Sequence, residues 1–373
     1  MAFSNYMQNS PKIKLHYICV FFVGIYMLLL PFEYIFSSEY GTINKYVGML
    51  VIGSCLIGGS LRSTLKSSQI AIILMLLFGI FSGVWAISSD YWNEVFFTYI
   101  KNAMLFLAIT QCDFSKKQSG FILNMNVIGS LLLVVYLVVS PNVTVDPYSG
   151  RTMITTGDNF FDPNYMAADV ILPIGFLCGN FYNNLIKKKY IKSILIAFLM
   201  IALFYVEILA GSRGALLAIL GMLATITLLN LKHRSIRKKI MFLLLIICIV
   251  AVVVLSVMPE QILERFSFGS ISGDEDGGGG RLVLWRAAWN AIKDNFVIGY
   301  GAGCAVPAVG LYHSVDRAAH SLYLSSILEF GIFATLLYFA IYKEVRTAYK
   351  KKLYGEVGIT IGIMIASVFL DTL

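Results

Sequence analysis

Long runs of apolar residues, separated by short polar connections, dominate the chain. Many runs hold roughly 18 or more residues without a charge, which is the length that crosses a bilayer as a helix. The runs are continuous and do not alternate between apolar and polar positions, so the strands of a membrane β-barrel are excluded. We therefore expect an all-α polytopic membrane protein with about 11 transmembrane helices. They are expected at about 15–36, 43–60, 69–88, 95–111, 119–140, 164–183, 191–210, 212–231, 240–258, 320–342 and 356–373.

Composition supports this prediction. Apolar residues make up 58% of the 373 residues and charged residues 13%, against about 45–50% and about 25% in a soluble domain. These values exclude a soluble enzyme, a disordered chain and a collagen-like repeat. The six cysteines are scattered and form no CxxC pair, so their spacing indicates neither a disulfide framework nor a metal site.

Positive charge is concentrated in every second connection. The net charge of +8 would suggest nucleic-acid binding in a soluble protein. Here 20 of the 29 Lys and Arg lie in alternate connections, and the rule that positive loops stay in the cytoplasm places these connections inside. The other connections carry the acidic residues and are expected outside. The cationic connections lie at about 12–14, 62–66, 116–117, 187–192, 232–239 and 343–352.

Two of the outer connections are longer than simple turns. One covers about 141–163 and the other about 259–319. A long loop between tightly joined helices is usually functional. We therefore divide the chain into a membrane bundle of helices 1–9 at 1–258, an extracytoplasmic loop at 259–319, and membrane helices 10–11 at 320–373.

The longer outer loop has two parts. The tract SGDEDGGGG at 272–280 is most simply a flexible hinge, although its acidic residues could also hold a cation. After the hinge, at 281–295 and just beyond, one apolar stripe at helical spacing consists of Leu282, Trp285, Trp289, Ile292 and Phe296. We expect a short amphipathic helix that lies on the outer membrane surface or caps the bundle, with arginines at the level of the lipid headgroups.

Arg213 lies where the seventh and eighth spans join with almost no loop, in GSRGALLAIL at 211–220. This places it at the outer mouth of the bundle, in the first turn of a helix. A helix N-terminus offers unpaired amides and the positive end of a dipole, which favour an anion. Gly211 and Gly214 let the backbone approach closely. The alternative is an interfacial arginine that only snorkels to the surface.

Further polar residues are expected on the same side. His320 opens HSLYLSSILEFG at 320–331, and an imidazole can take up a proton near neutral pH, as a general base must. In a structural role it would instead cap the helix. Asp162 with Pro163 is typical of a helix N-cap followed by proline at the first helical position. Asp158 and Asp162 could also contact sugar hydroxyls.

These motifs follow one another in a fixed order: GSRGALLAIL, then GGRLVLWRAAWNAI with GYGAG at 299–303, then HSLYLSSILEFG. In this order they resemble the O-antigen ligase and O-antigen polymerase superfamily, over about residues 160–342. DPNYMA before the sixth span is similar to a segment of many polymerase-like members. The family consists of multi-span glycosyltransferases that move a glycan from an undecaprenyl diphosphate carrier to an acceptor hydroxyl. The resemblance implies no cofactor and no metal. The partners it implies are a lipid-linked glycan, an acceptor glycan or lipid and the bilayer, but no nucleic acid.

The resemblance implies a role for each motif residue. Arg213 and Arg281 would bind the carrier diphosphate, and His320 would activate the acceptor hydroxyl for inverting attack on the anomeric carbon. The chemistry agrees, because a leaving diphosphate gains negative charge that arginine stabilises. Arg286 is a candidate further contact, although it lies about 140° round a helix from Arg281. Lys101, an ionisable residue within the fourth span, is a candidate for lining the carrier groove.

We therefore expect a glycosyltransferase of the bacterial plasma membrane with its active site on the extracytoplasmic face. DPNYMA favours a polymerase of surface polysaccharide repeat units over a ligase to a lipid A core. The second alternative, a flippase for the same lipid, would place polar residues near mid-membrane, whereas here they gather at the outer ends. Family members usually continue through one or two more spans, which raises the question of a product truncated at Leu373.

Overall fold

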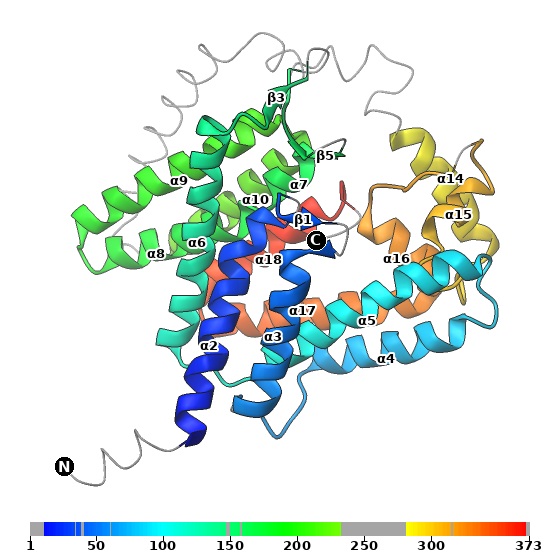
Figure 1. The fold of residues 1–373 in the computed structure, drawn as a ribbon, viewed down its shortest axis with the longest axis horizontal. Coiled ribbons are helices and arrows are strands. Elements are labelled where there is room, and N and C mark those ends of the chain that lie inside the picture. Colours follow the sequence, from blue (N-terminus) through cyan, green and yellow to red (C-terminus); the bar gives the residue numbers. More distant parts are fainter. Residues whose placement is uncertain are drawn as a thin grey trace. The chain divides into compact units, whose positions relative to one another are not determined.

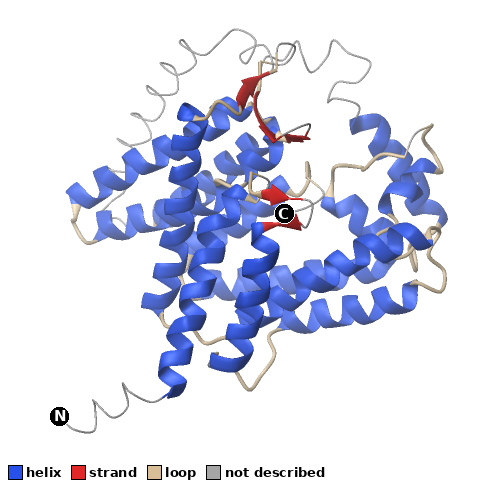
Figure 2. Ribbon diagram, in the orientation of Figure 1, coloured by secondary structure: helices blue, strands red, loops and turns tan. Residues whose placement is uncertain are grey.

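Helices make up most of the described chain (Figure 1, Figure 2). In the computed structural model the predicted span 240–258, the hinge at 272–280 and Asp158 lie outside the described residues. The described residues are 11–33, 35–38, 41–59, 61–146, 150–156, 159–232, 281–314 and 316–370.

The first five predicted spans each correspond to a helix. A short antiparallel pair of strands connects the first helix, which ends in a 3₁₀ turn, to the second. The elements are α2 (Pro11–Leu29), η1 (Leu30–Phe32), β1 (Ser37–Ser38), β2 (Gly41–Thr42), α3 (Ile43–Gly58), α4 (Ser67–Ser82), α5 (Ser89–Gln111) and α6 (Lys116–Val139).

The outer connection expected at about 141–163 forms a three-stranded antiparallel sheet. It consists of β3 (Val143–Val145), β4 (Thr152–Thr156) and β5 (Asn159–Phe161), with Thr144 opposite Met153. The next three predicted spans follow directly. They form α7 (Pro163–Ala168), α8 (Ile171–Ile186), α9 (Tyr190–Ala210) and α10 (Arg213–Asn230).

After the undescribed residues 233–280 the chain continues as a further set of helices. They are α14 (Arg281–Asp294), α15 (Ala305–Gly310), α16 (Leu322–Phe330), η2 (Gly331–Ala334), α17 (Thr335–Lys350) and α18 (Tyr354–Ala366). The expected helix at 281–295 is therefore confirmed as α14. The last two predicted spans correspond to α16 with α17 and to α18.

The face by which α14 packs differs from the apolar stripe in the sequence. Its buried residues are mostly small, Ala287, Ala288 and Ala291 among them. Trp289 remains 54% exposed and Leu282 51%. Small side chains let helices approach closely, and in a membrane the large apolar ones need not be covered by protein. The stripe therefore marks the packed face only in part: Ile292 is 4% exposed and lies in the core, whereas Leu282 and Trp289 are about half exposed.

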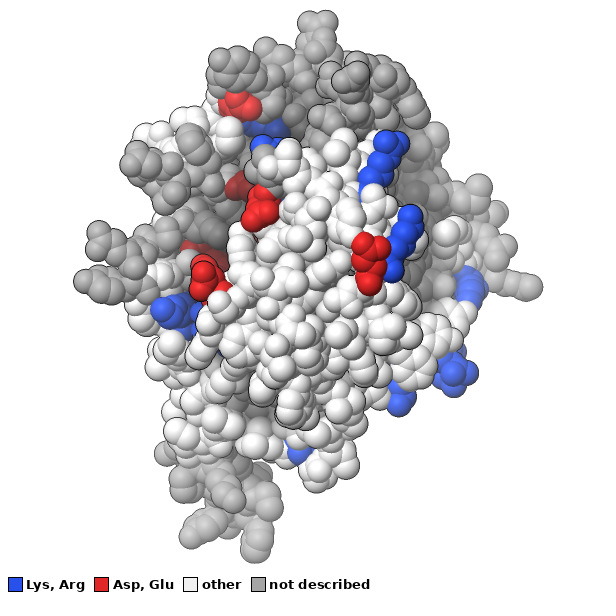
Figure 3. All heavy atoms as spheres, turned by 90° about the vertical axis from the view of Figure 1, so that its right-hand side faces the viewer, with Lys and Arg blue, Asp and Glu red and all other residues white. Residues whose placement is uncertain are grey.

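The chain is a multi-pass membrane protein. Within the described residues, six helical segments are long and apolar enough to cross a bilayer, and α3, α4 and α18 are shorter apolar helices. The total of about 11 spans and the large outer loop stay predictions. Large apolar side chains lie exposed along these helices, including Phe198 at 66%. Figure 3 shows a face with large areas free of charged residues. The six segments are Leu15–Phe32, Lys116–Val139, Pro163–Ile186, Tyr190–Ala210, Arg213–Asn230 and Leu322–Lys350.

The chain divides into two compact units, and each has its own core. In the second unit α10 and α18 pack closely, because α18 has glycines at Gly358 and Gly362 where it meets α10. A Cβ atom at Gly358 would lie 2.2 Å from Cγ1 of Ile226. The first unit comprises Met1–Gly129, Leu284–Ala319 and Tyr323–Glu344, and the second comprises Ser130–Val283, His320–Leu322 and Val345–Leu373.

Candidate functional site

The junction between α9 and α10 places Arg213 in the first turn of a helix, as predicted. α9 ends at Ala210 and is followed by Gly211, which has a left-handed φ of 56° and donates its N–H to the Glu207 carbonyl at 2.9 Å. Glycine adopts this conformation without steric cost. Ser212 then caps α10, because its hydroxyl accepts the N–H of Ala215 at 3.4 Å. The chain therefore turns within two residues, and Arg213 is the first residue of α10.

The guanidinium of Arg213 has no partner within the part of the chain that the structure describes. The side chain is half-buried. The ion pair found among the described residues joins two other side chains, Arg62 and Asp113, at 3.1 Å. A positive charge at the positive end of a helix dipole is unfavourable on its own. A bound anion would offset both the charge and the unpaired amides of this first helical turn.

Phe369, just after α18, contacts both arginine segments. A Cβ atom at Gly214 would lie 2.8 Å from Cβ of Phe369, so only glycine at position 214 admits this side chain. The guanidinium carbon of Arg281 lies 5.9 Å from the centre of the Phe369 ring, which is within the range of a cation–π interaction. One aromatic side chain therefore packs against the start of α10 and against Arg281.

The segment 367–370 also holds the chain next to His320. The N–H of Leu322 donates to the carbonyls of Ser367 and Leu370, each at 2.9 Å. Arg213, Arg281 and His320, which are far apart in the sequence, thus belong to segments that meet at residues 367–370 of the second unit. Nothing in the sequence of this segment singled it out as part of a site.

His320 has an unusual backbone conformation. Its φ is 50°, in the left-handed region that few residues other than glycine adopt. The residue before it, Ala319, is fully buried and accepts a hydrogen bond from Nε1 of Trp285 at 2.9 Å. The imidazole is half-buried. Local packing therefore fixes the backbone on which the imidazole is mounted.

The DPNYMA motif supports the start of α10. Asp162 caps α7, with Pro163 as the first helical residue, as predicted. Its Oδ1 accepts from the backbone N–H and from Nδ2 of Asn164, at 2.8 and 2.9 Å. Oδ1 of Asn164 in turn accepts from the Ser212 hydroxyl at 3.0 Å and from Nη2 of Arg151 at 2.9 Å. Asn164 therefore links α7 to the residue that precedes Arg213.

Arg151, just before β4, is a residue of this region that the motifs did not indicate. Its Nε donates to the carbonyl of Ala210 at 2.7 Å, so it also ties the end of α9 to the sheet of β3, β4 and β5. Glu207, which is 2% exposed, lies near enough to interact with it electrostatically. The sequence could have indicated Arg151 in one way, since it is the one basic residue between positions 141 and 163.

The GYGAG motif has a structural role in the first unit. The N–H groups of Tyr300 and Gly301 donate to the carbonyls of Leu328 and Glu329, at 2.7 and 3.2 Å. Two motifs of the sequence therefore hold each other in place through their backbones. The left-handed φ values that this turn requires fall on glycines: Gly299, Gly301 and Gly303.

Two other candidate residues belong to the first unit. Lys101 on α5 and Arg286 on α14 both have exposed side chains. Arg286 and Arg281 lie on different faces of α14, because five residues of an α-helix turn the chain by about 140° beyond one full turn. That Lys101 and Arg286 contact the carrier stays a prediction. A contact of Asp158 with sugar hydroxyls likewise stays a prediction.

Comparison with known protein families assigns the region that contains these motifs. Residues 196–339, from within α9 to within α17, match the family model described as O-antigen ligase. This stretch includes Arg213, Arg281 and His320. Comparisons with curated proteins and with solved structures gave no match. This match supports the resemblance of the region to the O-antigen ligase and O-antigen polymerase superfamily.

Proposed function

We propose that the protein is a glycosyltransferase that moves a glycan from undecaprenyl diphosphate to an acceptor hydroxyl on the extracytoplasmic face of the bacterial plasma membrane. The observation that carries this proposal is the meeting of three segments at residues 367–370. Those segments bring two permanently charged arginines, Arg213 and Arg281, and one imidazole, His320. This is the set of groups that a transfer from a diphosphate needs.

Arg213 and Arg281 bind the diphosphate of the donor. Guanidinium groups present forked donors that match phosphate oxygens, and their charge does not depend on pH in the physiological range. The first turn of α10 adds backbone amides directed at the same anion. As the glycosyl bond breaks, the electron pair remains on the diphosphate oxygen. The growing negative charge is then stabilised more strongly in the transition state than in the ground state.

His320 acts as the general base. Its neutral imidazole accepts the proton of the acceptor hydroxyl while the hydroxyl oxygen forms a bond to the anomeric carbon. The bond from that carbon to the diphosphate oxygen breaks on the opposite side, so the configuration is inverted. Arg286 and Lys101 are proposed as further contacts to the carrier. Asp158 and Asp162 are proposed as contacts to sugar hydroxyls, and Asp162 keeps its second oxygen for this purpose.

We favour a polymerase that joins repeat units of a surface polysaccharide, on the resemblance of DPNYMA. The alternative is a ligase that transfers the glycan to a lipid A core. The two reactions share the donor and differ in the acceptor. Purified protein given one lipid-linked repeat unit would form a ladder of longer lipid-linked products if it is a polymerase. A product that forms only when lipid A core is added would identify a ligase.

The arginine role is tested by substitution in this assay. Arg213→Ala should abolish transfer, because the diphosphate loses its contact at the helix start. Arg213→Lys keeps one positive charge but not the forked geometry, so activity should fall substantially without vanishing. Lys293→Ala is a suitable control, because Lys293 is an exposed cation at the other end of α14. Wild-type yield with Arg213→Ala would contradict the proposed role and leave the snorkelling alternative.

The same assay separates a transferase from a flippase. A flippase would move the labelled lipid between the leaflets of a vesicle and leave its glycan unchanged. We expect new glycosidic products from detergent-solubilised protein, where no leaflets exist. Lipid movement in vesicles without any new product would contradict the proposal.

A further inference from the structure

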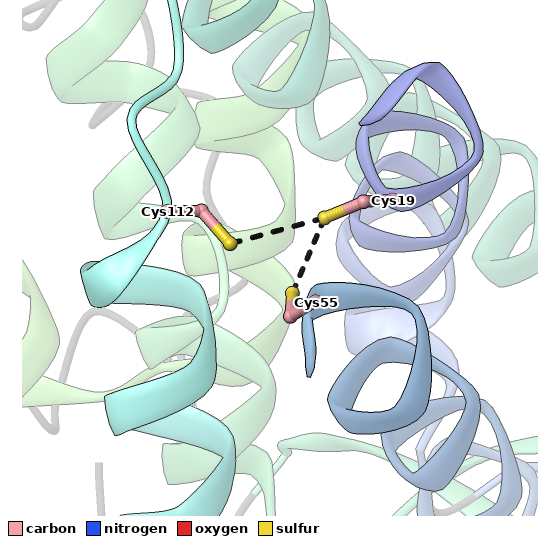
Figure 4. Close-up of side chains that lie close together, drawn as sticks. All are labelled: Cys19, Cys55 and Cys112. Carbon is pink, nitrogen blue, oxygen red and sulfur yellow. Dashed lines mark hydrogen bonds between the residues drawn. The ribbon is translucent and has the colours of Figure 1, made fainter. Parts of the chain in front are cut away.

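Three buried thiols meet in the first unit, whereas the segments of the proposed transfer site belong to the second. Cys19 comes from α2, Cys55 from the last turn of α3, and Cys112 from the residue that follows α5. They are 0%, 0% and 2% exposed. Figure 4 shows the three sulfur atoms directed towards one another from three separate elements. Sγ of Cys19 lies 3.2 Å from that of Cys55 and 4.0 Å from that of Cys112, and all three lie within 4.8 Å of one another.

The backbone around the thiols is built to bring them together. α3 ends in two glycines, and a Cβ atom at Gly59 would lie 2.7 Å from Sγ of Cys112. Leu61 pairs with Cys112 in a β-bridge, next to a hydrogen bond of 2.9 Å from the N–H of Arg62 to the carbonyl of Gln111. The loop after α3 and the end of α5 are therefore held side by side, which fixes the positions of two of the three thiols.

The spacing of the sulfurs suits a single soft metal ion. Bonds of about 2.3 Å from one ion to three sulfurs in a plane separate the sulfurs by about 4.0 Å, within the range found here. Among the described residues, no histidine or acidic side chain offers a fourth ligand atom within 4.8 Å of all three sulfurs, although His16, one turn earlier on α2, interacts electrostatically with Cys19. Zinc in a structural site takes four ligands. A ligand set of thiolates alone, three in number, is better matched to Cu(I), which soft thiolates select.

We propose that Cys19, Cys55 and Cys112 form a buried three-thiolate site for Cu(I). Each thiol that binds the ion releases its proton, and the ion then bridges α2, α3 and the end of α5. The site lies outside the matched stretch 196–339 and is independent of the proposed glycosyl transfer. Its role is to clamp three helices of the first unit at one end.

The predicted topology agrees with metal binding rather than a disulfide. The cluster lies next to the connections at 62–66 and 116–117, which the distribution of positive charge places in the cytoplasm. Thiols stay reduced in that compartment, and clustered cysteines there are more often metal ligands. The short separation between Cys19 and Cys55 makes a disulfide the main competing outcome.

The test uses the full chain, purified in detergent without oxygen, with reduced thiols and no metal. A chromophoric chelator loaded with Cu(I) is titrated with the protein, and the copper withdrawn is counted per chain. We expect one equivalent for the wild type, and at least a tenfold weaker competition for Cys19→Ser, Cys55→Ser and Cys112→Ser. Cys178→Ser and Cys304→Ser are matched controls, because both cysteines are buried outside the cluster, and they should retain the full equivalent.

Two further measurements keep the proposal testable if a variant fails to fold. X-ray absorption of the wild-type copper complex should show three sulfur neighbours, whereas nitrogen or oxygen neighbours would overturn the assignment. Mass spectrometry after alkylation should find Cys19, Cys55 and Cys112 alkylated, and therefore reduced, in protein purified under reducing conditions. A disulfide between Cys19 and Cys55, or wild-type protein that withdraws no more copper than the triple serine variant, would likewise overturn it.

Discussion

The residues proposed for catalysis are held in place by different means. Arg213 is fixed as the first residue of a capped helix, Arg281 rests over the ring of Phe369, and His320 is carried on a left-handed backbone between two anchored neighbours. Because the three residues lie on separate segments, a substitution that shortens one side chain should leave the backbone positions of the others in place. Their contributions to donor binding and to turnover should therefore be separable by experiment.

His320→Ala should reduce turnover by about 10²–10⁴-fold, which is the usual contribution of a general base. The affinity for the lipid donor should change little, because the arginines remain. Steady-state kinetics of glycan transfer, with kcat and KM measured separately, would show this as a loss confined to kcat.

His313→Ala is the matched control for that substitution. His313 lies seven residues earlier and is equally half-buried, but it is not part of the segment that is bound to residues 367–370. It should retain near wild-type turnover. If His313→Ala removed activity while His320→Ala retained it, the base would have been assigned to the wrong histidine.

At the scale of elements, the cap of α10 connects stability to function. Ser212→Ala removes the cap and the hydrogen bond to Asn164. The loss of a cap costs about 1 kcal/mol of unfolding free energy. We expect a small decrease in thermal stability and a larger increase in KM for the donor, because the first turn of α10 holds Arg213.

Ser88→Ala separates these two effects. Ser88 caps α5 and accepts the N–H of Tyr91 at 3.4 Å, the same distance as in the cap of α10. It should lower thermal stability to a similar degree and leave the KM for the donor unchanged. Equal effects of the two variants on KM would mean that the α10 cap has only a structural role.

The packing of Phe369 against α10 gives a second prediction for an element. Gly214→Ala places a methyl group 2.8 Å from Cβ of Phe369, so the segment 367–370 must move. We expect transfer activity to fall at least tenfold. Gly53→Ala is the control, because a Cβ atom there meets nothing within 4 Å, and alanine is favoured over glycine in a helix. Its activity should be unchanged, and unchanged activity in both variants would contradict a role for the Phe369 contact.

The sequence predicted those elements that depend on local patterns. Apolar runs located the described helices, although some ends differ by six to eight residues, as for α5 and α17, and the pair of Asp162 and Pro163 located the start of α7. It could not predict contacts between distant segments, because nothing in a single sequence records them. Phe369, Arg151 and the thiol cluster are all of this kind. The apolar stripe of α14 predicted the packed face only in part, because Ile292 is buried whereas Leu282 and Trp289 stay about half exposed.

At the scale of the whole molecule, the distribution of charge predicts which ends face the cytoplasm. A cysteine introduced at Ser314 should react with an impermeant thiol reagent added to intact cells, and one at Ser115 should not. Both positions are exposed, and the five native cysteines that the structure describes are buried, so background labelling should be low. Lysed cells should allow both positions to react. Labelling of Ser115→Cys but not Ser314→Cys in intact cells would invert the topology and remove the argument for an extracytoplasmic site.

The left-handed conformation of His320 has a consequence for attempts to make the protein more heat-stable. A residue with a Cβ atom in that conformation raises the energy of the folded state by about 1–2 kcal/mol, which glycine at the same position avoids. The imidazole is thus retained at the expense of folding free energy. A selection for thermal tolerance alone would therefore favour glycine at position 320, and we expect the best-folded variants that it returned to have lost transfer activity.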